Sequence, residues 1–503
     1  MSLVRCVLQY ISGLIGLPQG SVLSPLLFII YIADLLSAKS LPSHLSAFTE
    51  CYKYADDGSV SVVADSLPEC RANMQRVCDY IHAWCKRWRL AINCDQNKTE
   101  IIILRTNKSG HVDRSVVPPV YIGDKKLSYV AKSKVLGVTI DDDLSFVQHA
   151  NLTLRNCWYA WYKISDNTTR KRGFNTATLV LLFKTVILTK LLYAAPVWLY
   201  KRMDTFKDFL ARSSLKMIGS QFYPPKQLTN VLTGIPPLQL ILKILIVKFI
   251  LKSLSQGDSS SARIIQIEET PNHEYFSQVY DTKLFLLWMF KNRKRTADTP
   301  CPTSLRELSL AEVDSACLFY SDKLIKTYQC ELWDDMLKND MAGLINSDPF
   351  CIEPLQSTED LSAIVKTHNI LQHPLVARYN SRYQSTNLLD FLHGRCLRFQ
   401  NFAFSVLKYD KSKFVPLCLE CATSPDSIYH KIFECQSYCS NSDIVKLRNE
   451  LQNIQEFEVN FHLKILFSDD LYTRKIFFSL VQLICKESKF KDEYLVRIEE
   501  VNE

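Results

Sequence analysis

The chain has 503 residues, of which 47% are hydrophobic and 22% are charged. This length allows roughly two to four domains, and this composition excludes an intrinsically disordered chain. The formal net charge is +8, but residues 151–250 alone hold 15 lysines and arginines against three aspartates, so the basic character is concentrated there.

The cysteines indicate a reducing compartment. Their number, 17, is odd, and most are scattered singly along the chain. Gly13, Gly16 and Pro18 interrupt the opening apolar run, which therefore does not predict a signal peptide. We expect an intracellular protein, in the cytoplasm and nucleus, whose thiols are free outside any metal cluster.

A glycine-rich loop follows a strand-like start at residues 1–15. The loop consists of Gly16, Leu17, Pro18, Gln19 and Gly20. Ser24 then suits a helix N-cap with Pro25 at the first helical position, and the apolar pattern carries this helix to about Ser37. Glycines beside a glutamine at the start of a helix let the backbone approach a ligand closely.

The next motif reads as a β-hairpin. Residues 51–55 are extended, Asp57-Gly58 is a favoured two-residue turn, and serine and valine alternate from Ser59 to Val63. The adjacent carboxylates of Asp56 and Asp57 repel each other unless a cation compensates, and Mg²⁺ prefers such ligands. The alternative is an exposed, solvated turn, because Asp-Gly is common in hairpins.

Together, the Gly16–Gly20 loop, the helix after it and the Tyr54-Ala55-Asp56-Asp57 hairpin resemble the reverse transcriptases of non-LTR (LINE-type, jockey-like) retrotransposons. The resemblance implies an RNA template, a DNA primer and a dNTP as partners. It also implies that Asp56 and Asp57 hold catalytic Mg²⁺. The residues it assigns to the nucleotide and template site are Pro18, Gln19, Gly20, Tyr54 and Ala55.

The first 15 residues bear on whether this chain can polymerise DNA. In the family, an earlier strand of the palm carries another catalytic aspartate, because two-metal phosphoryl transfer uses carboxylates on both sides of the metal pair. Residues 1–15 contain no aspartate or glutamate. We therefore expect an N-terminally truncated reverse transcriptase that does not polymerise as this isolated chain.

A long amphipathic helix is predicted from Leu67 to Leu90. Its apolar positions step by three and four, which places them on one face: Met74, Val77, Cys78, Ile81, Trp84, Cys85 and Trp88. The tryptophans on this stripe are expected in the core rather than stacked on bases.

Two further motifs extend the resemblance. The first is Asn97-Lys98-Thr99-Glu100 before a strand at residues 101–104. The resemblance places Lys98 near the phosphates of the nucleotide, where it helps pyrophosphate to leave; the alternative is a surface lysine. The second, residues 135–141 with His149 beyond them, resembles the family's short hairpin at the junction of palm and thumb.

The basic region is predicted to be a helical thumb. Trp158, Tyr159, Trp161 and Tyr162 cluster ahead of Arg170-Lys171-Arg172, and helical patterns cover residues 177–192 and 238–254. Such an excess of positive charge binds a phosphate backbone without base specificity, although many of these lysines could instead be solvated helix faces. Three lysines, Lys243, Lys248 and Lys252, make the second helix a poor membrane span, so we expect no membrane partner.

The C-terminal signal is a metal-ligand pattern. Cys418, Cys421, His430 and Cys435 follow the spacing C-x2-C-x8-H-x4-C, which suits tetrahedral Zn²⁺ with a structural role; Cys439 is an alternative fourth ligand. The pattern also resembles the zinc knuckle of many retrotransposon proteins, which contacts nucleic acid.

The sequence therefore predicts an α+β chain: a partial polymerase palm of antiparallel strands with packed helices, then a mostly α-helical thumb and connector, and a small zinc knuckle. The predicted boundaries are 1–150 for the palm, 151–255 for the thumb, 256–400 for the connector, 401–445 for the knuckle and 446–503 for a last helical segment. The predicted function is RNA-directed DNA polymerase of a retrotransposon. The alternative is a non-catalytic nucleic-acid-binding protein that uses the basic thumb and the zinc knuckle.

Overall fold

A computed structural model places two compact units, Met1–His149 and Ala150–Glu503, which are described separately. The residues that the structure describes are 20–35, 41–54, 57–95, 98–104, 113–165, 174, 176–218, 230, 233–255, 276–292, 320–345, and, near the C-terminus, 417, 418, 421, 423, 424, 430, 434–438, 442, 445, 446 and 449. Strands occur in the first unit and helices in both, so the predicted α+β class is confirmed.

The predicted hairpin is present, but its turn lies elsewhere. Strand β1 (Thr49–Tyr54) pairs antiparallel with β2 (Asp57–Val62), and Tyr54 lies opposite Asp57. Residues 55 and 56 therefore connect the strands, and the turn predicted at Asp57-Gly58 is wrong. The observed register places Cys51 opposite Val60, and both pack against the buried cluster beneath the hairpin. One face of the hairpin therefore packs on the core.

Helix α2 (Ser24–Tyr31) begins with Pro25 in its first turn, as predicted, but Leu23 and not Ser24 is at its N-cap. It also ends before the predicted Ser37. The ammonium of Lys53 on β1 donates hydrogen bonds to the carbonyl oxygens of Ile32 and Ala33, each at 3.0 Å. A cation at a helix C-terminus stabilises the carbonyls that have no partner inside the helix, which favours a helix end at this point.

None of the residues of α2 is buried, although its sequence is almost entirely apolar. The side chains of Leu26, Leu27, Ile29 and Ile30 are 48–62% exposed. Within the helix, Phe28 is partly buried and packs against the core cluster; just beyond the helix, Ile32 is 8% exposed and belongs to that cluster.

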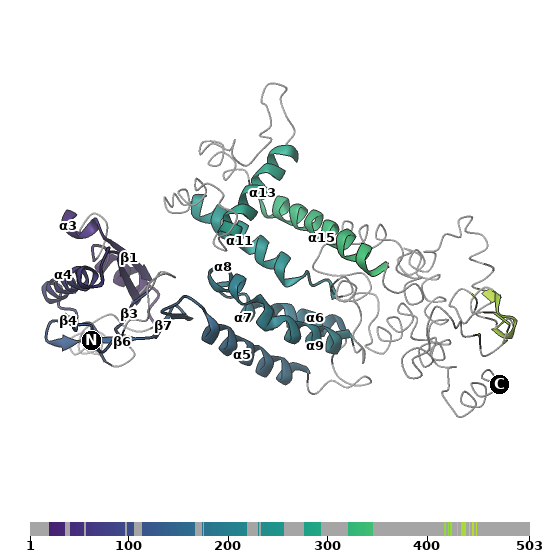
Figure 1. The fold of residues 1–503 in the computed structure, drawn as a ribbon, viewed down its shortest axis with the longest axis horizontal. Helices are drawn as coiled ribbons and strands as arrows, with labels where there is room; N and C mark the ends of the chain where they lie inside the picture. The colour runs from purple at the N-terminus through teal and green to yellow at the C-terminus, as the bar shows by residue number, and fades with distance from the viewer. Residues whose placement is uncertain are drawn as a thin grey trace, which may run out of the picture. The chain divides into compact units, whose positions relative to one another are not determined.

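Helix α4 (Leu67–Arg87) confirms the predicted amphipathic helix and packs against the strands of the first unit (Figure 1). The hydroxyl of Ser66 accepts a hydrogen bond from the backbone N–H of Glu69, which caps the helix. Trp84 is 6% exposed and lies in the core, as predicted. Trp88 is 38% exposed beyond the end of the helix, so its assignment to the core is wrong.

Short strands complete the first unit. They form three two-stranded pairs: β3 (Glu100–Ile102) parallel with β6 (Ser128–Val130), β4 (Tyr121–Ile122) antiparallel with β5 (Lys125–Lys126), and β7 (Lys132–Val135) antiparallel with β8 (Val138–Asp141). The β7–β8 pair is the short hairpin expected at residues 135–141. Its turn residues, Leu136 and Gly137, both have positive φ, which matches the twist of the strands.

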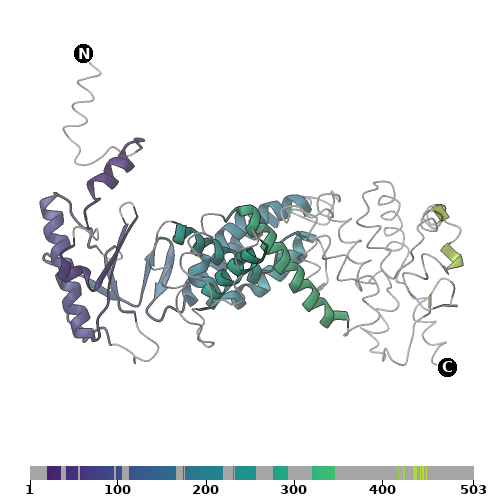
Figure 2. The ribbon, with the colours of Figure 1, turned by 90° about the horizontal axis from the view of Figure 1, so that it is seen from above.

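The described part of the second unit is mostly helical (Figures 1 and 2). Its long helices are α5 (Val147–Ser165), α9 (Lys207–Ile218), α11 (Leu238–Ser255), α13 (Phe276–Asn292) and α15 (Asp322–Ile345). Between α5 and α9 lie α6 (Thr176–Leu182), a π-helical segment (Phe183–Leu188), α7 (Thr189–Leu191), α8 (Ala195–Trp198) and two 3-10 turns (Leu199–Lys201 and Met203–Phe206). The helices predicted at 177–192 and 238–254 are thus confirmed.

Aromatic side chains fill the core between the first helices of this unit. Trp161 is 1% exposed, and its ring meets the ring of Phe183 edge to face at 5.3 Å. Phe209 of α9 is fully buried and stacks against Phe183 at 6.1 Å. Trp161 is therefore a core residue of this unit.

Helix α11 pairs two of its lysines with its helical neighbours. Lys243 lies 3.2 Å from Asp281 of α13, and Lys248 lies 2.9 Å from Asp322 of α15. Burial raises the pKa of Asp281, and the charge of Lys243 opposes that shift. Within the described residues, no single helix is both long enough and apolar enough to cross a membrane. One pair of helical segments, Thr176–Leu191 and Ala195–Lys201, meets these length and composition criteria when taken together, but the pair is bent by 52°.

Candidate functional sites

The predicted polymerase residues lie only partly within the described chain. Pro18, Gln19, Ala55 and Asp56, together with the basic triplet at 170–172, lie outside the described residues. Gly20, Tyr54, Asp57 and Lys98 are described, and all four are exposed. Tyr54 ends β1 and is 69% exposed, while Asp57 opens β2 directly opposite it.

Gly20 and Lys98 are held by their own local structure. Gly20 has φ of +87°, a left-handed conformation that is strained for any other residue, and it immediately precedes the turn into α2. The backbone N–H of Lys98 donates to the carbonyl of Asp95 at 3.0 Å. Within the described residues, Lys98 and Asp57 are joined by no hydrogen bond or ion pair, so the structure does not bring these two predicted residues together.

Lys53 and Asp34 connect the two motifs, and sequence reasoning missed both. Lys53 lies one residue before Tyr54 and binds the carbonyls at the end of α2. Asp34, in the turn after α2, accepts a hydrogen bond from the indole N–H of Trp84 at 3.3 Å. The helix that follows the Gly20 loop is therefore tied to the double-aspartate hairpin and to α4. A lysine on an exposed strand gives no sequence signal for such a bond.

Replacing Lys53 with methionine should loosen this connection. Methionine keeps the length of the side chain but removes the donor, so the carbonyls of Ile32 and Ala33 lose a charged partner. Because Lys53 is largely exposed, we expect a loss of only about 1 kcal/mol in the unfolding free energy of the first unit. Hydrogen exchange of the amides at the end of α2 measures this loss. Lys125→Met, at another exposed strand lysine, is the control and should leave those amides unchanged.

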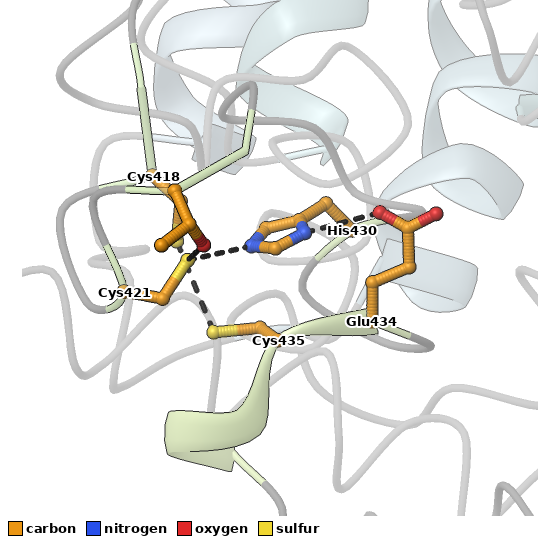
Figure 3. A network of polar contacts seen from close by, with 6 residues as sticks. Cys418, Cys421, His430, Glu434 and Cys435 are labelled. Atoms are coloured by element: carbon orange, nitrogen blue, oxygen red, sulfur yellow. Dashed lines mark hydrogen bonds and ion pairs between the residues drawn. The ribbon is translucent and has the colours of Figure 1, made fainter.

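The C-terminal cysteines and histidine come together as the spacing predicts (Figure 3). One ligand atom from each of Cys418, Cys421, His430 and Cys435 lies within 4.8 Å of the others. The sulfurs of Cys418 and Cys435 are 4.0 Å apart, and the sulfur of Cys421 is 3.1 Å from Nε2 of His430. Cys439, the alternative ligand, lies outside the described residues. This arrangement can hold a four-coordinate metal ion.

Hydrogen bonds around the cluster favour the thiolate that a metal needs. Desolvation works against ionisation of Cys421, but hydrogen bonds from Thr423, His430 and the backbone of Ser424 lower the pKa of its thiol from 9.0 to about 6. The hydroxyl of Thr423 lies 3.1 Å from that sulfur. The backbone N–H of Cys418 donates to the carbonyl of Ser424 at 2.8 Å, which closes the turn carrying the first two ligands.

Glu434 is a further member of the site that the spacing does not reveal. Its carboxylate oxygen lies 3.1 Å from Nδ1 of His430, on the side of the ring away from the cysteines (Figure 3). The other ring nitrogen of His430 faces the sulfur of Cys421. A carboxylate that accepts from one histidine nitrogen leaves the second nitrogen free to bind a metal.

A family model matches within the first unit, and several known proteins are similar to part of the chain. A family model described as "Reverse transcriptase (RNA-dependent DNA polymerase)" matches residues 9–140. A probable RNA-directed DNA polymerase from transposon BS of Drosophila melanogaster is 29% identical over 185 residues, which are 37% of this chain and 19% of that protein. The RNA-directed DNA polymerase from mobile element jockey of Drosophila funebris is 25% identical over 213 residues, 41% of this chain and 22% of its own length.

A third relative supports the same assignment. The probable RNA-directed DNA polymerase from transposon X-element of Drosophila melanogaster is 30% identical over 140 residues, 27% of this chain and 14% of that protein. The chain thus spans about a fifth of the length of the first two relatives. No solved structure matches it. The segment matched by the family model contains the Gly20 loop, helix α2 and the hairpin with Asp57, and it is similar to the reverse transcriptases of jockey-like, non-LTR retrotransposons.

Proposed function

We propose that the first unit forms part of the palm of an RNA-directed DNA polymerase. In this reaction the 3′-hydroxyl of a DNA primer attacks the α-phosphorus of a dNTP selected by an RNA template, and pyrophosphate leaves. The observation that carries the proposal is the family match over residues 9–140. The register of the hairpin supports it, because pairing Tyr54 with Asp57 puts the double aspartate at the connection between the strands.

The residues have distinct roles in this proposal. Asp56 and Asp57 hold Mg²⁺; the exposed carboxylate of Asp57, with no partner among the described residues, fits that role. Bound Mg²⁺ would stabilise the charge that develops on the phosphate oxygens. Pro18, Gln19, Gly20, Tyr54 and Ala55 line the nucleotide and template site. Lys98 assists the departure of pyrophosphate.

Iron-directed cleavage tests the metal site without depending on activity. Fe²⁺ bound in place of Mg²⁺ generates hydroxyl radicals with ascorbate and peroxide, and these cut the backbone near the metal. We expect cuts around residues 54–58 that excess Mg²⁺ suppresses and that the double variant Asp56→Asn, Asp57→Asn loses. Asp65→Asn, at an exposed aspartate just beyond β2, should keep the cuts. Cuts that survive in the double variant would exclude these aspartates as the ligands.

A non-catalytic nucleic-acid-binding protein is the second candidate function. It is supported by the charge of residues 151–250, which hold 15 lysines and arginines against three aspartates. The iron-cleavage experiment, combined with a binding measurement across a salt series, separates the two functions. Cuts near residues 54–58 that require Asp56 and Asp57 support the polymerase site, and salt-sensitive binding without such cuts supports the binding protein.

We further propose that residues 151–255 act as a basic thumb, that 256–400 connect it to the C-terminal part, and that Cys418, Cys421, His430 and Cys435 hold structural Zn²⁺. Tetrahedral zinc with Zn–S bonds of about 2.3 Å separates two sulfurs by about 3.8 Å. The 4.0 Å between Cys418 and Cys435 fits this requirement. Four protein ligands leave no open position, so zinc there would stabilise the fold rather than react.

Glu434 should tune this zinc site. Replacing it with alanine removes the acceptor at Nδ1 of His430, so the imidazole is no longer held with Nε2 toward Cys421. We expect a loss of about 10- to 100-fold in zinc affinity, measured by competition with a chromogenic chelator. Glu434→Gln keeps an acceptor and should lose less. Lys446→Ala, at an exposed charged side chain in the same part of the chain, should leave the affinity unchanged.

A further inference from the structure

One face of α5 combines exposed tyrosine rings with positive charge. Tyr159 is 64% exposed and Tyr162 is 53% exposed. Arg155 and Lys163 are also exposed, and their positions relative to the tyrosines place all four on one side of the helix. We call these four residues, together with Lys216 of α9, the tyrosine face.

Lysines lie over both rings. The ammonium of Lys163 is 4.4 Å from the ring centre of Tyr159, and that of Lys216 is 5.7 Å from the ring centre of Tyr162. Helix α5 contains no aspartate or glutamate at any position. An anionic partner is therefore attracted by the positive charge beside each ring, and no acidic side chain on α5 repels it.

The ring of Tyr162 is also held in place from below. Tyr162 stacks on Trp158 at 5.4 Å with 23° between the ring planes, and Trp158 meets the buried ring of Phe209 edge to face at 4.8 Å. This column of rings runs from the core of the unit to its surface. A platform fixed in this way loses little conformational freedom when a flat partner stacks on it.

We infer that the tyrosine face binds single-stranded nucleic acid, with unpaired bases stacked on Tyr159 and Tyr162 and phosphates beside Lys163, Lys216 and Arg155. Stacking on tyrosine requires bases that are not paired in a duplex, and flanking lysines suit the backbone of such a strand. The inference deepens the proposed role of residues 151–255, because it names the surface and the form of nucleic acid that it takes.

Fluorescence anisotropy with an unstructured 12-nucleotide oligo-U RNA and a blunt duplex of the same length tests the inference on the full chain. The double variant Tyr159→Ala, Tyr162→Ala should bind the single strand at least 10-fold more weakly and the duplex nearly as well as the wild type. Tyr159→Phe with Tyr162→Phe keeps the rings and should keep the affinity. Lys163→Ala should reduce the slope of log affinity against log salt by about one.

Tyr193→Ala is the matched control, since Tyr193 is 54% exposed but lies outside α5. It should bind the single strand like the wild type. The inference is overturned if the double alanine variant binds the single strand as tightly as the wild type, or if it loses equal affinity for the duplex. It is also overturned if polyglutamate displaces the RNA equally well from the wild type and from the double alanine variant. Iron cleavage at Asp56 and Asp57 is independent of these outcomes, so failure here is distinguishable from failure of the polymerase assignment.

Discussion

Replacing Cys435 with serine is expected to abolish zinc binding at the C-terminal cluster. Cys435 is fully buried, and its sulfur is 4.0 Å from that of Cys418, so it cannot be replaced by solvent without opening the site. Structural zinc sites have apparent binding free energies of about 10–16 kcal/mol in small peptides, and the loss of one thiolate removes a large part of this. Elemental analysis after gel filtration should fall from one zinc per chain to none.

The control is Cys330→Ser, at a half-buried cysteine of α15 outside the cluster. It should retain one zinc per chain. A wild-type protein that folds in full without metal, or a Cys435→Ser variant that keeps its zinc, would show that these four residues do not form a structural zinc site.

Replacing Trp161 with alanine should destabilise the helical unit more than any surface change. The side chain is 1% exposed and packs edge to face on Phe183, so its removal leaves a large cavity between α5 and the π-helical segment. Such changes cost about 3–5 kcal/mol in unfolding free energy. The midpoint of the helical transition in urea, followed by circular dichroism, measures the effect.

Tyr159→Ala removes a large aromatic side chain from the same helix, but at a position that is 64% exposed. Its cost should stay below about 1 kcal/mol, because surface substitutions seldom cost more. Equal shifts for the two variants would mean that Trp161 does not lie in a packed core.

Local patterns predicted the elements whose structure depends on nearby residues. The apolar residues from Val77 to Trp84 recur every three or four positions, and this spacing predicts both helix α4 and its buried face. Helix periodicity can be read in this way because it is a property of the segment itself. The metal-ligand cluster was also predictable, because its residues are close in the sequence: Cys418 and Cys435 are only 17 positions apart. Cysteine and histidine are also chemically distinctive as metal ligands.

Features that depend on distant partners were not predictable in the same way. The turn is expected at Asp57-Gly58 because that dipeptide favours turns, yet Tyr54 pairs with Asp57, which leaves residues 55 and 56 between the strands. Helix α2 ends at Tyr31 where Lys53, 21 positions beyond Ile32, reaches its carbonyls. Trp88 continues the apolar spacing of α4 but falls beyond the last turn of the helix.

The exposed apolar surface of α2 has a practical consequence for handling the protein. Leu26 and Ile30 lie one helical turn apart, are 55% and 62% exposed, and belong to a helix without a charged residue. Contiguous apolar surface of this kind promotes adhesion between molecules and to hydrophobic media. Lysine or glutamate at these two positions is therefore the first change to make when a preparation of this chain precipitates, since neither side chain supports the core of the first unit.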